Sequence, residues 1–298
     1  MNFRGPSKVI LIASILLSLV TSGEAVSDQT VETPRLIVSD MTGMLSQGRL
    51  EELAHDADIM LLNIWRIWSS KSRIHKFGKI RVEFHHAAKK GARYSIFHWS
   101  KESGHFVRTV RVFGVNGQPQ QMTHKLIHAA FSNPDKLIRN MMGIYSENRL
   151  GNKKSFPMCG FSNDVWVQAL LQIDSTIPLD SLGPDHSDWG MEFLNNRPFV
   201  RNRAKQHAAY AEAGSFAEYL IRTYGIDNMK KFNRLSRSKE RPWNEAFGRS
   251  LDILEAGWIH YLKSEFEANA NDVLILKRLR KANPNTACFK ARSLVPNR

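Results

Sequence analysis

The sequence predicts an α+β protein in which a small N-terminal β-sheet with one helix is followed by a mainly helical C-terminal half. Between residues 33 and 119, short runs rich in β-branched and aromatic residues are separated by turn residues, which is typical of strands. After residue 120, apolar residues recur every three or four positions, which is the period of packed helices. We therefore divide the chain into an N-terminal α/β subdomain at 33–119, a helical subdomain at 120–275 and a basic tail at 276–298.

The front half opens with a predicted short strand at residues 36–38. Apolar residues at helical spacing predict a helix at residues 48–69. Three more strand-like runs follow at residues 79–85, 93–99 and 107–112. Together these elements are enough for a small sheet that is covered by one helix.

The back half contains four predicted helices. The first, at residues 120–131, stops before Pro134, and the second covers residues 164–172. The third covers residues 208–224 and ends at a glycine. The fourth begins near Trp243 and carries one apolar stripe.

Residues 1–25 have the order of a secretory signal peptide. Arg4 and Lys8 precede an apolar run at residues 9–20, and Gly23 and Ala25 stand where a signal peptidase needs small residues. The alternative is a membrane anchor, but the run is about a dozen residues long and a membrane-spanning helix needs about 20. We therefore expect a secreted or periplasmic protein with no membrane span after cleavage.

The charge of the chain is strongly basic. It has 42 Lys and Arg against 28 Asp and Glu, a formal net charge of +14. This balance favours anionic partners such as envelope components, although it also serves general solubility. The basic residues are scattered before Asp272, the last acidic residue, so the sequence carries no specific signal for nucleic acid.

Cys159 and Cys288 are the only cysteines of the chain. In an oxidising compartment an even number of cysteines favours a disulfide, which would hold the basic tail to the body of the protein. Two unpaired, buried thiols are the alternative.

His124 and His128 lie four residues apart on the first predicted helix of the back half. Residues at this spacing share one face of a helix. Two imidazoles placed in this way can bind one metal ion, which is the geometry of zinc sites with the H-E-x-x-H motif. Two ordinary histidines on a packed helix would give the same pattern.

The surrounding sequence resembles the gluzincin metallopeptidases, in particular their peptidase MA-like branch. Glu147 follows the histidine pair, and residues 210–216 (YAEAGSF) come later in the same order as in that family. The resemblance implies a gluzincin-like fold in which His124, His128 and Glu147 bind zinc. It also implies that Tyr210 stabilises the oxyanion of the reaction.

One residue departs from the family at the position that matters most for catalysis. The glutamate that activates the zinc-bound water in that family is Lys125 here. A lysine is normally protonated and cannot act as a general base near neutral pH. At about 5 Å and an effective dielectric constant near 20, its ammonium would also repel Zn²⁺ by about 7 kcal/mol. Ile144, Asn148 and Leu150 depart from the family pattern as well.

These observations leave three functional hypotheses. The first is an exported metallopeptidase-like protein that has lost peptide hydrolysis and binds an unidentified peptide or protein, with zinc held weakly or not at all. The second is an active zinc hydrolase that uses an unusual base. The third is a basic module that binds the cell envelope.

The first testable prediction concerns the N-terminus. Because residues 1–25 have the charged, apolar and small-residue order of a signal peptide, we expect the mature chain to begin near Val26. Intact-mass measurement of exported protein checks this, and a mass that still includes residues 1–25 would contradict it.

Overall fold

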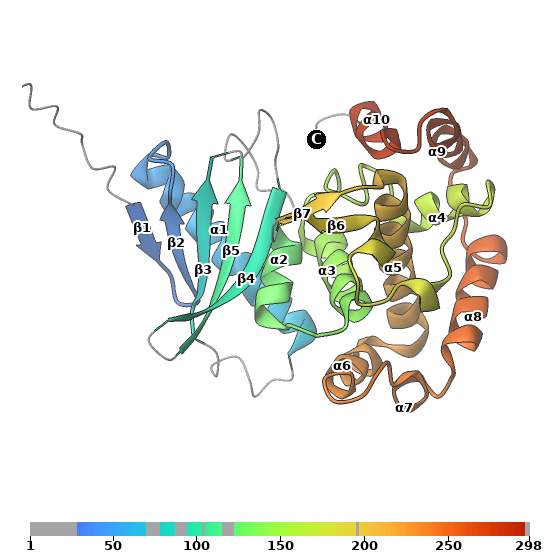
Figure 1. Ribbon diagram of the computed structural model, residues 1–298, viewed down its shortest axis with the longest axis horizontal. Coiled ribbons are helices and arrows are strands. Elements are labelled where there is room, and N and C mark those ends of the chain that lie inside the picture. Colours follow the sequence, from blue (N-terminus) through green and yellow to red (C-terminus); the bar gives the residue numbers. More distant parts are fainter. Residues whose placement is uncertain are drawn as a thin grey trace, which may run out of the picture.

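The computed structural model describes residues 29–69, 78–86, 94–102, 105–114, 122–194 and 197–295. The predicted signal peptide and the last three residues of the basic tail lie outside these ranges. Within them the α+β prediction is confirmed, because a small mixed sheet is followed by a mostly helical half (Figure 1).

The N-terminal sheet has five strands in the order β1-β2-β3-β5-β4. Their bounds are β1 Gln29–Glu32, β2 Leu36–Asp40, β3 Ile80–His85, β4 Tyr94–Glu102 and β5 His105–Phe113. The central strands β2, β3 and β5 are parallel, and the two edge strands run antiparallel to their neighbours. Residues of β2 and β3 alternate between buried and partly exposed, which is the pattern of a sheet with one face on the core.

Helix α1 (Gln47–Trp68) packs against this sheet and begins at Ser46, whose hydroxyl accepts a hydrogen bond from the backbone of Arg49. Near its other end, the indole of Trp68 donates a 2.8 Å hydrogen bond to the Ser146 hydroxyl of the helical half. Both groups are buried, so this bond joins the two halves at a defined register.

The helical half is arranged around α5, which is buried along most of its length (Figure 1). The helices are α2 Met122–Ala130, α3 Lys136–Leu150, α4 Asn163–Leu171, α5 Arg203–Tyr224, α6 Ile226–Leu235, α7 Trp243–Phe247, α8 Leu251–Ser264, α9 Ala270–Ala282 and α10 Ala287–Leu294. Two short 3-10 turns, Leu179–Ser181 and Ser187–Trp189, precede a hairpin of β6 Met191–Leu194 and β7 Arg197–Val200. Helix α2 contacts the sheet, α1 and α3, so it lies at the junction of the two halves.

Several parts of the back half differ from the elements that the sequence predicts, and α3, α6 and the β6–β7 hairpin lie where it predicts none. The single helix expected from Trp243 is two helices, because Gly248 adopts a left-handed conformation with φ of 72° that ends α7. The basic tail is largely the helices α9 and α10. No helix among the described residues has the length and apolar composition that a membrane span needs.

The predicted disulfide is present. Cys159 and Cys288 are joined with their Cα atoms 5.4 Å apart, across a sequence separation of 129 residues. The bond ties α10 to the segment that precedes α4, which holds the basic tail to the body of the protein.

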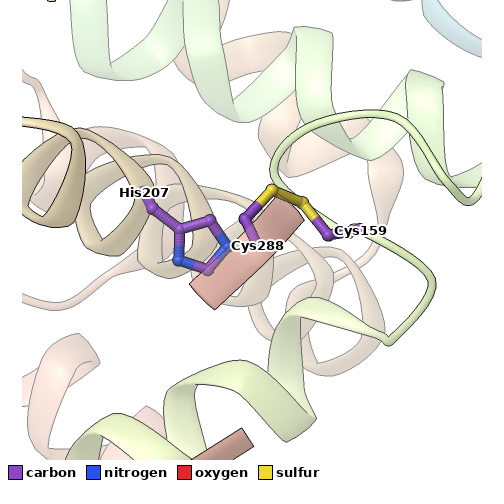
Figure 2. A group of neighbouring side chains, drawn as sticks. All are labelled: Cys159, His207 and Cys288. Carbon is purple, nitrogen blue, oxygen red and sulfur yellow. A yellow bond between two sulfur atoms is a disulfide. The ribbon is translucent and has the colours of Figure 1, made fainter. Parts of the chain in front are cut away.

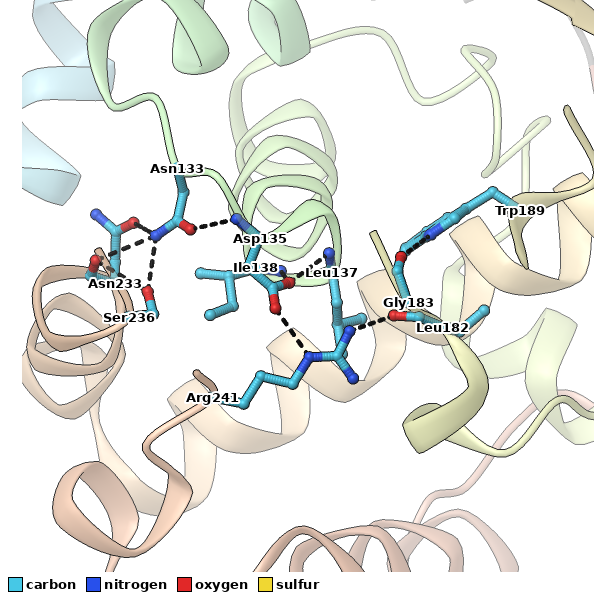
Figure 3. Close-up of polar contacts among 10 residues, drawn as sticks. All are labelled: Asn133, Asp135, Leu137, Ile138, Leu182, Gly183, Trp189, Asn233, Ser236 and Arg241. Atoms are coloured by element: carbon cyan, nitrogen blue, oxygen red, sulfur yellow. Dashed lines mark hydrogen bonds and ion pairs between the residues drawn. The ribbon is translucent and has the colours of Figure 1, made fainter. Parts of the chain in front are cut away.

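The start of α3 is held by Asp135. Its carboxylate accepts hydrogen bonds from the backbone N–H groups of Leu137 at 2.8 Å and Ile138 at 3.2 Å, which caps the helix. The same carboxylate accepts a 2.8 Å hydrogen bond from Nε of Arg241, whose Nη2 donates to the carbonyl of Leu182 (Figure 3). One arginine therefore connects three segments that are distant in the sequence.

Asn133 forms a second set of hydrogen bonds at the start of α3. Its Nδ2 donates to Oδ1 of Asn233 at 2.7 Å and to the Ser236 hydroxyl at 2.8 Å, while its Oδ1 accepts from the backbone of Asp135 at 2.9 Å (Figure 3). These groups join the end of α6 to the start of α3. The register of α3 is thus set by polar contacts at its first residues.

We expect Arg241→Ala to lower the free energy of unfolding by about 2 kcal/mol, because it leaves a largely buried carboxylate without its charged partner. The matched control is Lys239→Ala, which removes an exposed ion pair with Glu245 and should cost less than about 1 kcal/mol. Urea unfolding of the two variants measures the difference. Equal losses would show that Asp135 does not depend on Arg241.

Candidate functional site

The two histidines of the predicted metal site lie together on α2. The ring centroids of His124 and His128 are 4.4 Å apart, and the residues are 2% and 6% exposed. The Nε2 atom of each ring is buried and has no hydrogen-bond partner among the described residues. Burial holds the pKa of both rings well below the usual value, so both are neutral.

The ring of His124 is held between α3 and α5. A Cβ atom added to Gly143 would lie 2.9 Å from three atoms of this ring, so α3 needs a glycine where the ring packs on its backbone. Tyr210 of α5 stacks on the ring with centroids 6.2 Å apart. Asn140 interacts with both the His124 side chain and the Tyr210 hydroxyl. Burial raises the pKa of Tyr210, so its hydroxyl keeps its proton and can donate a hydrogen bond.

Glu147 lies nearby but is engaged elsewhere. It is 1% exposed, and its Oε2 accepts a 3.1 Å hydrogen bond from the backbone N–H of His124. Its Oε1 accepts from the backbone of Asn152 at 3.3 Å, while burial raises its pKa. The ligand atoms of His124, His128 and Glu147 do not all lie within 4.8 Å of one another. Joint zinc binding by the three residues therefore remains a prediction.

Three cations lie on α2 and the start of α3, and two of them, Lys125 and Arg139, act on the histidine pair. Lys125 is next to His124 on α2, and Lys136 and Arg139 lie on the first turns of α3. Burial, together with the charge of Arg139, lowers the pKa of Lys125 and of Lys136 to about 8, although Lys125 keeps part of its side chain in solvent. The charges of Lys125 and Arg139 also contribute to the low pKa values of His124 and His128.

This donor set does not fit a tightly bound zinc ion. The two free Nε2 atoms supply two ligands, whereas a catalytic zinc site uses three from the protein. The Glu147 carboxylate, which is the expected third ligand, accepts backbone hydrogen bonds instead. The positive charges nearby also oppose a divalent cation.

Comparison of the chain with known protein families, with curated proteins and with solved structures gave no match. The likeness to the gluzincins therefore rests on the motif residues and their order.

Another cluster of potential ligands was not predicted from the sequence. Among the described residues, only Cys159, His207 and Cys288 form a group of three whose ligand atoms lie within 4.8 Å of one another (Figure 2). Because the two sulfur atoms are bonded to each other, they offer no thiolates to a metal. Nε2 of His207 donates a 2.9 Å hydrogen bond to the carbonyl of Pro157. In this state the cluster is a structural part of the core.

Sequence reasoning also missed Lys136 and Arg139. A signal was present, because cations in the first turns of a helix oppose the helix dipole, and acidic residues are the usual choice there. The first turn of α3 has no acidic residue. Such an unfavourable placement suggests a role beyond the stability of the helix.

The pH dependence of stability should depend on His207. Burial, followed by the charge of Arg280, lowers its pKa to about 3. Below about pH 6.5 the unfolded chain binds a proton that the folded chain excludes until about pH 3, so the free energy of unfolding falls as the pH falls through this window. Wild type therefore loses free energy of unfolding between pH 7 and pH 4.5, and we expect His207→Gln to reduce this loss by about 2 kcal/mol.

Urea unfolding at the two pH values measures this difference. The matched control is His55→Gln on the exposed face of α1. This variant should lose as much free energy of unfolding between the two pH values as wild type does. An unchanged loss in His207→Gln would show that this ring takes up its proton in the folded state.

Proposed function

We propose that this chain is an exported metallopeptidase-like protein that does not hydrolyse peptides and acts by binding a peptide or protein. The observation that carries the proposal is Lys125, which occupies the position of the general base beside a neutral, buried histidine pair. The order of the motif residues supports the relation to gluzincins, and residues 1–25 support export.

Two requirements of metallopeptidase chemistry are unmet at this centre. A general base must accept a proton from water, and Lys125, whose pKa burial lowers to about 8, is still mostly protonated at pH 7 and is a poor base there. A metal must supply the Lewis acid and activate the water, and here Lys125 and Arg139 add positive charge where a cation would bind. Binding of a peptide needs neither step.

An active zinc hydrolase with an unusual base is the second candidate. The buried Nε2 atoms of His124 and His128 favour it, because unpaired polar atoms in a protein interior are rare and commonly face a ligand or ion. Metal content separates the two candidates.

We expect purified wild-type protein to bind zinc weakly and to cleave neither casein nor peptides. Loss of a general base typically lowers the rate by about 10²–10⁴-fold. Lys125→Glu should raise zinc affinity, because it removes a repelling charge and adds an acidic group beside His124. Zinc stoichiometry and proteolysis assays, wild type beside the variant, measure both effects.

Lys231→Glu is the control, since it makes the same charge change on the exposed surface of α6 and should leave zinc affinity unchanged. Cleavage by wild type that a chelator and His124→Ala both abolish would overturn the binding function and establish the hydrolase.

A further inference from the structure

A groove with a mostly apolar lining lies beside α8, at the outer edge of the helical half (Figure 1). It is open to solvent and has a volume of about 710 Å³. One face of α8, the end of α4 and the segment that follows α4 form its walls. Leu171, Ile177 and Ile259 line it and are only partly buried, so apolar surface is available for contact with a ligand.

Residues 176–178 form one wall of the groove, and hydrogen bonds hold this wall in place. The backbone N–H of Ile177 donates to the buried carboxyl group of Glu212 on α5, at 3.1 and 3.0 Å from its two oxygens. The backbone N–H of Leu179 donates to Oε1 of Glu255 on α8 at 3.0 Å. Because two helices fix the segment, the groove exists before a ligand binds.

Negative charge is concentrated at one end of the groove. Oε2 of Glu255 accepts no hydrogen bond from the described residues, and the side chain is only partly buried. Burial raises the pKa of Glu255, and the negative charges of Asp180 and Asp252 raise it further. Within the described ranges, none of these three carboxylates forms an ion pair within 4.0 Å. The cation Lys263 lines the other end, about 12 Å further along the axis of α8, and His260 lies between the two ends.

This arrangement complements a basic side chain that is attached to an apolar segment. A guanidinium or ammonium group donates charge-assisted hydrogen bonds to a carboxylate, and these are stronger than hydrogen bonds between neutral groups. The apolar lining next to Glu255 offers contact area to the neighbouring residues of the same ligand. The net charge of +14 repels basic ligands over the molecule as a whole, so a preference for them must come from a local site.

We propose that this groove binds an apolar peptide segment through a basic side chain that reaches Glu255. The inference rests on the proposed binding function, because it places and describes the peptide that the chain binds. The apolar residues of the peptide cover Leu171 and Ile259, and its cation bonds to the free oxygen of Glu255. None of the residues that line the groove belongs to the histidine centre.

Three probes of equal length test the site. They are an acetylated and amidated tripeptide of arginine, valine and leucine, the same peptide with citrulline in place of arginine, and the same peptide with glutamate there. Citrulline has nearly the shape of arginine without its charge. Calorimetry at low salt, with the full mature chain, measures the three affinities.

We expect the arginine peptide to bind about tenfold more tightly than the citrulline peptide, and the glutamate peptide to bind most weakly. Added salt should reduce the difference between arginine and citrulline. The net charge of the protein alone would favour the glutamate peptide, so the two explanations predict opposite orders.

The test variant is Glu255→Gln, which removes the charge and keeps an oxygen that can accept from the backbone N–H of Leu179. We expect its affinity for the arginine peptide to fall about tenfold and its affinity for the citrulline peptide to stay as in wild type. If Glu255 only held the wall of the groove, the variant would change both affinities equally or neither. Glu240→Gln, on the exposed segment between α6 and α7, is the matched control and should change neither affinity.

A second variant tests the groove itself. Ala256 is exposed and lines the groove, so Ala256→Trp should fill it and abolish binding of both peptides. Ala282→Trp makes the same change at the exposed end of α9 and should leave both affinities unchanged.

Three results would overturn the groove and leave the binding function standing. These are equal affinity for the arginine and citrulline peptides, no binding of either peptide at low salt, and a preference for arginine that Glu255→Gln does not reduce. Cleavage of the peptides by wild type would instead contradict the proposed function.

Discussion

The hydrogen-bonded ion pair between Asp135 and Arg241 is the contact on which the candidate site depends. It sets where α3 begins, and α3 carries Lys136, Arg139 and the glycine on which His124 packs. A shift of this helix by one residue would turn these side chains by about 100°, since a turn takes 3.6 residues. The polar contacts at the start of α3 therefore determine which charges face the histidine pair.

The centre of the molecule combines the histidine spacing of a zinc site with the positive charges of Lys125 and Arg139. The neutral rings of His124 and His128 remain side by side, and the charges of Lys125 and Arg139 act on both of them. Glu147 has become part of the packing between α2 and the segment after α3 through its backbone hydrogen bonds. The change from hydrolysis to binding in our proposal therefore requires a reversal of charge and leaves the helices in place.

Periodicity predicted the fold class and most element positions, because the apolar residues of α1 and α5 and the alternation in β3 are local patterns. The same reasoning placed the two histidines on one face of a helix. It could not show where the Glu147 carboxylate turns, because that depends on backbone groups of α2 and of the loop after α3. Nor could it bring Arg139 to the histidine pair, because only tertiary packing sets the position of α3 relative to α2.

The disulfide gives the C-terminal helices a second attachment to the rest of the chain. Cys288 lies on α10, and the Lys154 ammonium donates a 2.6 Å hydrogen bond to the carbonyl of Val295, close to the same bond. A protease that cuts the exposed connection between α8 and α9 would thus produce a nicked protein of unchanged mass, apart from one water. The severed segment, with its exposed Lys281 and Lys290, would separate only after reduction. In an oxidising, protease-rich environment, this linkage preserves the positive surface of the molecule after its backbone has been cut.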